Sequence, residues 1–574
     1  MTEYIVKKNR GDADDIDINS DDVDITAQPT YTVDDLFKRS YGPTIYPNDV
    51  ISKGPWVDVR SFGASGSAQQ TTGTIASGTT SLVLTDAKDF SNGMGIRIDG
   101  AGASGADLVT TIESGGGTTT PVLADAASTT VSSVTVDHDD SIAFQAAINA
   151  VILTDNKNIF VPGGVYNLAT KISLPSSDLD IVGIGFPIIN VTSGGIAFEQ
   201  TNHNVLTRFI GLKFTGAGIG IKYIMEELSN TYYEYEISHC YFEHDAGYYG
   251  IHLENAREGK ISNCFFEGGS VSWSGGNGIY SKKTVGTHVS QCDFHSCNIG
   301  IFQDGAASSK SAGLSLNQVS MLGCDEAVKI DQADDFRMVN SNIDYNNYSV
   351  QLLGVNRARI SGCFIAGTNL DDNPALIMDD STERTQLVSV SDCLFQGYYD
   401  AANTYDTVYL NHTKNCHFTD CNFTFYTRYG LSIGGTDIHL RVTNCTFAPR
   451  STFGVNSIYT RDTDNSTSQV TGCNLEDAPA TSLVRYAHNV GWVVTNCGVQ
   501  TMSNPDTTMQ VTHGCDVTPN VITISRNDME GGANVNEYSA HTITATEFTI
   551  AVDVTPVGGV DFYWYCTHST VGLR

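Results

Sequence analysis

The sequence predicts an all-β fold in which a parallel β-helix is accompanied by smaller β-modules at both ends. A six-residue pattern recurs with nearly constant spacing, and helical periodicity is absent from the same region. The pattern is an apolar residue, a polar residue, a small polar residue, Cys, a variable residue and an apolar residue. It occurs as ISHCYF (237–242), ISNCFF (261–266), VSQCDF (289–294), ISGCFI (360–365), VSDCLF (390–395), TDCNF (419–423), VTNCTF (442–447), VTGCNL (470–475) and VTNCGV (494–499).

The spacing of this pattern is that of a solenoid. LNQVSM (316–321) and MVNSNI (338–343) are degenerate copies, so the 257 residues from Cys240 to Cys497 divide into ten steps of about 26 residues. A second run of short segments, such as GIHLEN from Gly250 and GIFQDG from Gly300, lies between the first. Short strands without crossover helices can stack only on their equivalents in the next coil. The repeat cysteines are then expected to form a buried stack.

Composition excludes several classes of function. The net charge is −32, which disfavours binding to nucleic acid and to anionic membrane surfaces. No apolar run is long enough to span a membrane, and the polar start MTEYIVKKNRGDADD does not resemble a signal peptide. The C-x4-C pairs lack partners that would complete a zinc site, so we expect no metal and no cofactor.

The segments outside the coils are assigned in chain order. Residues 1–55 are expected to be an acidic arm, and residues 56–504 the β-helix. Within the latter, residues 64–137 suggest an inserted β-module, and residues 139–153 a capping helix that begins at Asp139 and Asp140. Residues 505–574 alternate Thr, Ile, Val and Phe, as in a separate antiparallel β-domain for trimerisation or carbohydrate binding.

Aligning the coils predicts a first ladder of acid–base residues. Glu243, Glu267 and His295 each lie three positions after a repeat cysteine. Equivalent residues of adjacent coils are about 4.8 Å apart, near the roughly 5–5.5 Å between the carboxyl groups of retaining glycosidases. Residues separated by a skipped coil would suit the roughly 6.5–9.5 Å of inverting glycosidases. Solvated turn residues are the alternative interpretation of this ladder.

A second ladder follows the other strand of each coil. It contains Glu254, Lys282, Asp304, Asp331 and Asp379, with Leu353 as the interruption. Asp304 and Asp331 are further catalytic candidates, although a solvated surface of alternating charge has the same pattern. The candidate substrate-binding residues are Lys282 of this ladder, Arg337 a turn away from Asp331, and the aromatic residues Trp273, Tyr280 and Tyr345 beside the ladders.

The N-terminal part of the coils resembles a known family. WVDVRSFGASG, DDSIAFQAAINA, NIFVPGGVYNLATKISLP and LDIVGIG resemble the start of pectate-lyase-like right-handed parallel β-helix proteins. With its arm, coils and final domain, the chain resembles bacteriophage tailspike depolymerases. This resemblance implies a homotrimer on the virion that binds and cleaves a bacterial capsule or O-antigen polysaccharide. It also implies that the arm attaches to the phage tail or an adaptor protein.

The sequence leaves three hypotheses for how the protein acts on a polysaccharide. We expect hydrolysis, because the chain lacks an aligned Asp cluster with a companion Arg that would mark a calcium-dependent lyase. A polysaccharide lyase that uses Lys282, His295 and Arg337 for β-elimination is the second hypothesis. A trimeric adhesin that attaches to the host without cleaving its glycan is the third.

Overall fold

The computed structural model describes most of the chain from residue 56 onward. The described ranges are 56–153, 157–201, 205–225, 235–269, 275–305, 310–367, 373–379, 383–397, 406–434, 439–449, 456–460, 469–475, 485–487, 495–502, 507–513, 518–526, 538–544, 546–553 and 560–567. The expected acidic arm, residues 1–55, and the candidate Trp273 lie outside them. Among the described residues no helix has the length and apolarity needed to cross a membrane.

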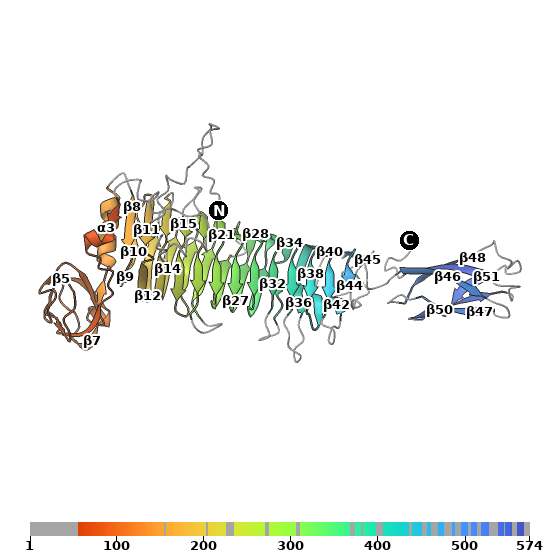
Figure 1. The fold of residues 1–574 in the computed structure, drawn as a ribbon, viewed down its shortest axis with the longest axis horizontal. Helices are drawn as coiled ribbons and strands as arrows, with labels where there is room; N and C mark the ends of the chain where they lie inside the picture. Colours follow the sequence, from red (N-terminus) through yellow and green to blue (C-terminus); the bar gives the residue numbers. More distant parts are fainter. Residues whose placement is uncertain are drawn as a thin grey trace, which may run out of the picture. The chain divides into compact units, whose positions relative to one another are not determined.

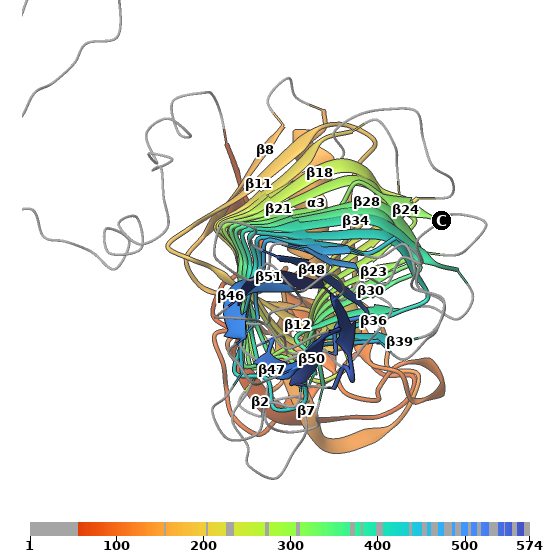
Figure 2. The same ribbon diagram turned by 90° about the vertical axis from the view of Figure 1, so that its right-hand side faces the viewer.

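The coils form a parallel β-helix, which confirms the predicted fold (Figure 1). Every coil strand pairs in parallel with its equivalent one coil earlier, as Phe266 does with Phe242. Along the stack, β11, β18 and β28 form one wall, while β23, β30 and β36 form another (Figure 2). Each coil makes a sharp turn at a left-handed residue, such as Asn263 with φ 52°. Asn tolerates this conformation better than most residues because its short side chain bonds locally.

Within the described residues one wall is a 16-stranded sheet, called here the first sheet. It consists of β1 (Val57–Asp58), β8 (Asn158–Pro162), β11 (Leu179–Ile184), β13 (Thr207–Ile210), β15 (Tyr235–Ser238), β18 (Arg257–Ser262), β21 (Val285–Ser290), β24 (Ser311–Ala312), β25 (Ser315–Asn317), β28 (Ala333–Val339), β31 (Asn356–Ser361), β34 (Thr385–Ser391), β37 (Thr413–Thr419), β40 (Arg441–Thr443), β43 (Gln469–Thr471) and β45 (Arg485–Ala487).

The remaining coil strands form a sheet with two rows, which β12 (Ile188–Gln200) and β14 (Lys213–Ile224) span continuously. The short row is β9 (Val165–Leu168), β16 (Tyr241–His244), β19 (Phe265–Glu267), β22 (Asp293–His295), β26 (Ser320–Leu322), β29 (Asn342–Asp344), β32 (Phe364–Ala366), β35 (Leu394–Gln396), β38 (Asn422–Thr424), β41 (Thr446–Ala448) and β44 (Asn474–Leu475). The long row is β10 (Ile172–Ser173), β17 (Tyr249–Glu254), β20 (Asn277–Lys282), β23 (Ile299–Asp304), β27 (Glu326–Asp331), β30 (Tyr348–Leu353), β33 (Leu376–Asp379), β36 (Asp406–Asn411), β39 (Tyr429–Gly434) and β42 (Asn456–Thr460).

Stacked side chains fill the interior of the coils. The described repeat cysteines from Cys240 to Cys473 are buried and carry free thiols, as the period-two pattern predicts. Phe214, Phe242, Phe266 and Phe294 stack face to face, with ring centroids 5.0, 4.8 and 4.5 Å apart. Burial of these apolar ladders supplies the main stabilisation of the coils.

Helix α3 (Ser141–Val151) contacts the 3-10 helix η1 (Val59–Phe62) and strands β8 and β10. Its buried side includes Phe144, Ala147, Ile148 and Val151, as the sequence predicts. Asp140 does not have the capping role that the sequence predicts, because this N-cap residue makes no side-chain hydrogen bond to the start of the helix. Its carboxylate instead accepts the amides of Ser65 and Asn167 at 2.8 and 3.1 Å, which ties the helix start to neighbouring strands.

The chain between η1 and α3 forms a separate antiparallel sheet with its own apolar core. In spatial order it contains β3 (Val83–Leu84), β2 (Gln70–Ile75), β7 (Val131–Asp139), β4 (Gly95–Ile98), β5 (Leu108–Ser114) and β6 (Val122–Leu123), and η2 (Ala103–Gly105) precedes β5. Strand β7 runs directly to α3, so the sheet is continuous in sequence with the helix.

The C-terminal part contains two antiparallel sheets of three described strands each. They are β46 (Thr495–Met502), β51 (Val560–Thr567) and β48 (Val521–Arg526), and β47 (Thr508–Thr512), β50 (Glu547–Val552) and β49 (Tyr538–His541). The segment 494–499, expected as a last coil, differs from the prediction because β46 pairs antiparallel with β51. Trp564 is buried there, whereas Tyr563 and Tyr565 are exposed on the other side of the strand.

Candidate active site

The first predicted ladder lies on the outer side of the short row. Glu243 pairs in register with Glu267, and Glu267 with His295, so the three side chains occupy adjacent coils as the sequence predicts. Lys213 on the preceding coil lies 2.8 Å from Glu243. The hydroxyl of Tyr241 donates to Glu267. Both carboxylates therefore already have partners within the protein.

An aromatic stack accompanies this ladder. Tyr241 stacks on Phe265 with ring centroids 5.0 Å apart, and Phe265 meets His295 edge to face at 4.8 Å. Burial and the hydrogen bond to Glu267 raise the pKa of the Tyr241 phenol, so the phenol remains a protonated donor at neutral pH. The hydrogen bond from Tyr241 holds the Glu267 carboxylate in one orientation.

The second predicted ladder lies on the outer side of the long row. Glu254 pairs with Lys282, and Lys282 with Asp304. Asp331 follows on the next coil, because Gln303 and Ile330, the residues before Asp304 and Asp331, are paired. The Nζ of Lys282 lies 3.7 Å from Glu254. Two carboxylates on adjacent rungs, next to an ammonium group, can perform acid–base or nucleophilic chemistry.

Tyr280 belongs to the same surface as Asp304. Its hydroxyl donates to Oδ2 of Asp304 at 2.6 Å, a short charge-assisted hydrogen bond. Burial and this hydrogen bond raise the pKa of the Tyr280 phenol, which keeps it protonated. The bond holds the Asp304 carboxylate in one orientation.

Further aromatic and cationic side chains extend this surface along the long row. Tyr249, His252 and Phe302 lie with ring centroids 5.2, 4.8 and 5.6 Å from that of Tyr280. Lys329 lies 5.3 Å from the centroid of Phe302. Burial, and next the charge of Lys222, lower the pKa of His252, so this imidazole is neutral near pH 7. We call Tyr249, His252, Tyr280, Phe302, Asp304, Lys329 and Asp331 the long-row surface.

The remaining candidates are placed elsewhere. Arg337 lies in β28 of the first sheet, on a different wall from the long row. Tyr345 follows the short-row strand β29, and its side chain is exposed. Arg337 was expected a turn away from Asp331, and the chain does turn from the long row to the first sheet between these two residues.

Sequence reasoning missed Phe302 and Lys329 as members of the long-row surface. Both occupy the position of Tyr280 on the next coils, as the pairs Tyr280–Phe302 and Phe302–Lys329 show. The alignment that located Lys282 and Asp304 contains this column two residues earlier. The strand alternation of period two was the signal that could have found them.

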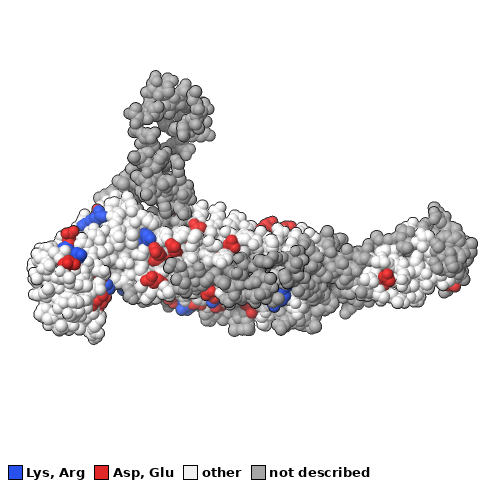
Figure 3. All heavy atoms as spheres, turned by 60° about the horizontal axis from the view of Figure 1, so that its bottom comes forward, with Lys and Arg blue, Asp and Glu red and all other residues white. Residues whose placement is uncertain are grey.

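Charge along the coils is mostly negative on the face that Figure 3 shows, where acidic side chains are scattered and Lys and Arg are sparse. No group of three or more His, Cys, Asp and Glu side chains in the described part of the chain is placed to hold a metal ion.

Residues 133–353 match the family model of rhamnogalacturonase A/epimerase, pectate lyase-like. The resemblance to pectate-lyase-like proteins is thus confirmed for this segment, which contains the first predicted ladder and the second as far as Asp331. No curated protein matches the sequence.

Among solved structures, the chain is similar to the A-module of a mannuronan C-5 epimerase of Azotobacter vinelandii, with 13% identity, 61% of this chain and 95% of that chain covered, and a TM-score of 0.42. It is also similar to a PL6 alginate lyase in complex with a trisaccharide, with 12% identity, coverages of 60% and 84%, and a TM-score of 0.42. For the tailspike of Pseudomonas phage phi297 the identity is 11%, the coverages are 88% and 82%, and the TM-score is 0.37.

Proposed function

We propose that the protein is a depolymerase that binds and cleaves a bacterial surface polysaccharide by hydrolysis of glycosidic bonds at the long-row surface. The observation that carries the proposal is the hydrogen bond from Tyr280 to Asp304, 2.6 Å long, with Asp331 on the adjacent rung. Glycoside hydrolysis requires such a pair of carboxyl groups beside a site where a sugar ring can lie. The family model matched by residues 133–353 supports a carbohydrate substrate.

The two carboxyl groups receive different roles. Asp304, oriented by the Tyr280 hydroxyl, is assigned as the nucleophile that attacks the anomeric carbon. Asp331 is assigned as the acid that protonates the leaving oxygen and then, as a base, activates water. Adjacent rungs about 4.8 Å apart suit the shorter carboxyl separation of retaining enzymes, so we expect retention of configuration.

Aromatic rings along the long row supply the binding surface for the sugars. Phe302 and Tyr280 are partly exposed neighbours on adjacent coils, and Tyr249 lies beside Tyr280. Aromatic faces pack against the apolar faces of pyranose rings, and the phenol hydroxyl can hydrogen-bond to a sugar. A polysaccharide lying along the stack would meet such groups on successive coils.

A lyase is the second candidate, and the position of Lys282 favours it. Lys282 lies between Glu254 and Asp304 in the ladder, where an ammonium group can neutralise the carboxylate of a uronic acid before its α-proton is removed. Lys329 offers a second cation two coils further along. The raised pKa of Tyr280 disfavours its phenolate as the base at neutral pH.

The proposal includes a trimeric assembly and a location on the virion. By resemblance to tailspikes, three chains would associate on the virion and act at the host surface, with residues 1–55 attached to the phage tail or an adaptor protein. Light scattering of the purified full chain tests the assembly, because a trimer has three times the chain mass of 61.7 kDa.

The test of the activity is incubation of the full-length protein with a panel of capsular and O-antigen polysaccharides. Shortening with new reducing ends and no unsaturated uronate absorbance is expected. Shortening with that absorbance would replace hydrolysis by β-elimination. Tight binding to one glycan without shortening would contradict the enzyme proposal and favour an adhesin.

A further inference from the structure

A column of basic side chains follows the outer side of the first sheet. The register pairs align Lys260, His288, Ser315, Arg337, Arg359, Ser389, His417 and Arg441, one per coil. We call these eight residues the basic ladder. No acidic residue interrupts it, although the chain has 64 acidic and 32 basic residues. All of its cationic and imidazole side chains are exposed.

The same column behaves differently in the earlier coils. There Asp180, Arg208 and Glu236 are stacked, and Arg208 lies 3.0 and 3.2 Å from the two carboxylates. Alternating signs neutralise that part of the column within the protein. Among the described residues, by contrast, Lys260, Arg337, Arg359 and Arg441 form no salt bridge, so their charge is available to a ligand.

The neighbouring column on one side of the basic ladder consists mainly of hydroxyl groups. Its members, two residues further along each strand, are Ser262, Ser290, Asn317, Val339, Ser361, Ser391, Thr419 and Thr443. On the other side, two residues earlier along each strand, the acidic members are Glu258 and Asp335. Asp335 is held by Arg357 at 2.8 Å. Cations flanked by hydroxyl donors and acceptors match a ligand that carries both anionic groups and hydroxyls.

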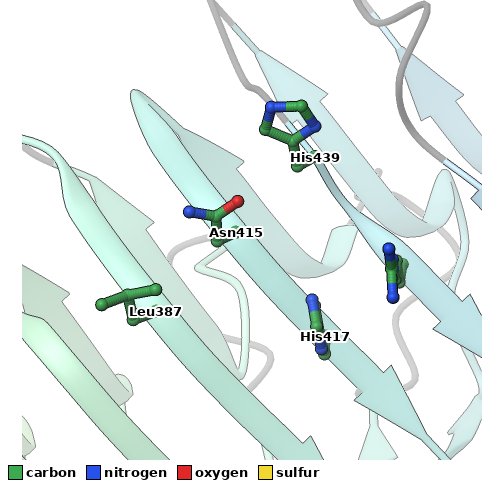
Figure 4. A pocket seen from close by; sticks show the side chains of 5 residues that line it. Leu387, Asn415, His417 and His439 are labelled. Atoms are coloured by element: carbon green, nitrogen blue, oxygen red, sulfur yellow. The ribbon is translucent and has the colours of Figure 1, made fainter.

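The surface is hollowed at the C-terminal end of the basic ladder. A hollow of about 420 Å³ is lined by Leu387, Asn415, His417, His439 and Arg441. Figure 4 shows Asn415 and His417 on one strand, Leu387 on the strand before it and His439 just ahead of the strand after it. None of the five described residues that line the hollow is a carboxylate. Burial and the charge of Arg441 lower the pKa of His417, which agrees with a locally positive site.

We propose that the basic ladder binds an acidic polysaccharide, with one carboxylate of a uronic acid seated in the hollow between His417, His439 and Arg441. Seven steps from Lys260 to Arg441 span about 34 Å, the length of several sugar residues. The ladder lies on a different wall from the long-row surface. This inference therefore goes beyond the proposed cleavage and holds whether or not the protein cleaves the glycan.

A nucleic acid is a poorer match for the basic ladder. Duplex DNA carries one charge per about 1.7 Å, far denser than one cation per rung, and the net charge of −32 repels such a polymer. Ser315 and Ser389 carry no charge, so they lower the density of positive charge along the ladder further. A polysaccharide with one carboxylate per sugar or per few sugars fits this lower density.

The test measures binding of a fluorescent galacturonate hexamer to the full-length protein by anisotropy, with maltohexaose and a dodecamer of thymidylate as comparison probes. R359Q combined with R441Q removes two cations. R357Q is the matched control, because Arg357 lies in the same strand but is engaged by Asp335. Replacement of both ladder arginines by lysine retains the charge. Light scattering follows the oligomeric mass of every variant.

The galacturonate hexamer is expected to bind more tightly than maltohexaose and more weakly as salt is added. R359Q/R441Q is expected to lower its affinity at least tenfold, R357Q to leave it unchanged, and the lysine variant to restore most of it. Equal binding of both hexamers, or no effect of R359Q/R441Q, would overturn the proposal. Tighter binding of the thymidylate probe would indicate a nucleic-acid surface, and an altered oligomeric mass a subunit interface; either result also overturns it.

Discussion

Replacement of Asp304 by Asn separates a catalytic role from a structural one. The substitution removes the negative charge but keeps an oxygen that can accept the Tyr280 hydroxyl, now bonded at 2.6 Å. Loss of a nucleophile or an acid–base group commonly costs 10²–10⁴ in rate, or about 2.7–5.5 kcal/mol of transition-state stabilisation. Weakening of a partly exposed hydrogen bond costs only about 0.5–1.5 kcal/mol, about tenfold at most. We therefore expect D304N to lower kcat at least a hundredfold.

Glu267→Gln is the matched control for this experiment. Glu267 also accepts a tyrosine hydroxyl and also has a carboxylate on the adjacent rung, but it lies on the short row. Reducing-end release from a polysaccharide that the wild-type protein cleaves gives kcat and KM for both variants, and thermal unfolding checks their folding. Activity of D304N within tenfold of wild type would refute the reasoning. A hundredfold loss in E267Q alone would move the site to the short row.

Three further predictions concern the coils. F266A removes a ring stacked at 4.8 and 4.5 Å and is expected to destabilise the fold by about 3–5 kcal/mol, whereas F265A, its outward neighbour, costs less; thermal unfolding of both compares them, and equal losses would contradict the packing argument. Burial lowers the pKa of His244 to about 4, so below pH 6.5 the unfolded state takes up a proton first, and up to about 3 kcal/mol of stability is lost by pH 4; H244N should lose less over this pH range. The repeat cysteines from Cys240 to Cys473 are buried, so a thiol reagent should modify them only after unfolding, and rapid labelling of Cys264 in the native protein would be inconsistent with the interior stack.

The register of the coils was predictable because each coil carries its own marker. The repeat cysteine and the alternation of period two placed Glu243 over Glu267, and Lys282 over Asp304, without any view of the fold. Alternation determines which residues point outward, and the coil period determines which of them are neighbours. These two properties are local, so the sequence alone contains them.

The arrangement of the walls was not predictable in the same way. The sequence places a turn between Asp331 and Arg337, but periodicity does not give the angle of that turn, which puts the two residues in different sheets. The basic ladder was accessible in principle, because every member lies four positions before the repeat-cysteine position, as Arg359 does before Cys363. Both predicted ladders consist of positions after the cysteine, so neither includes this column.

The long-row surface and the basic ladder lie on separate walls, so the two proposed activities should respond to mutation independently. The Debye length is about 8 Å at physiological salt, so an anionic group on the ladder is influenced by only the nearest rungs, about 4.8 Å apart, rather than by the net charge of the whole chain. An acidic glycan can thus be held by Arg359 and Arg441 despite the excess of acidic residues elsewhere. It follows that D304N should retain binding of the galacturonate hexamer at the ladder. R359Q/R441Q should conversely preserve kcat on a glycan that the long-row surface cleaves, with any loss confined to KM.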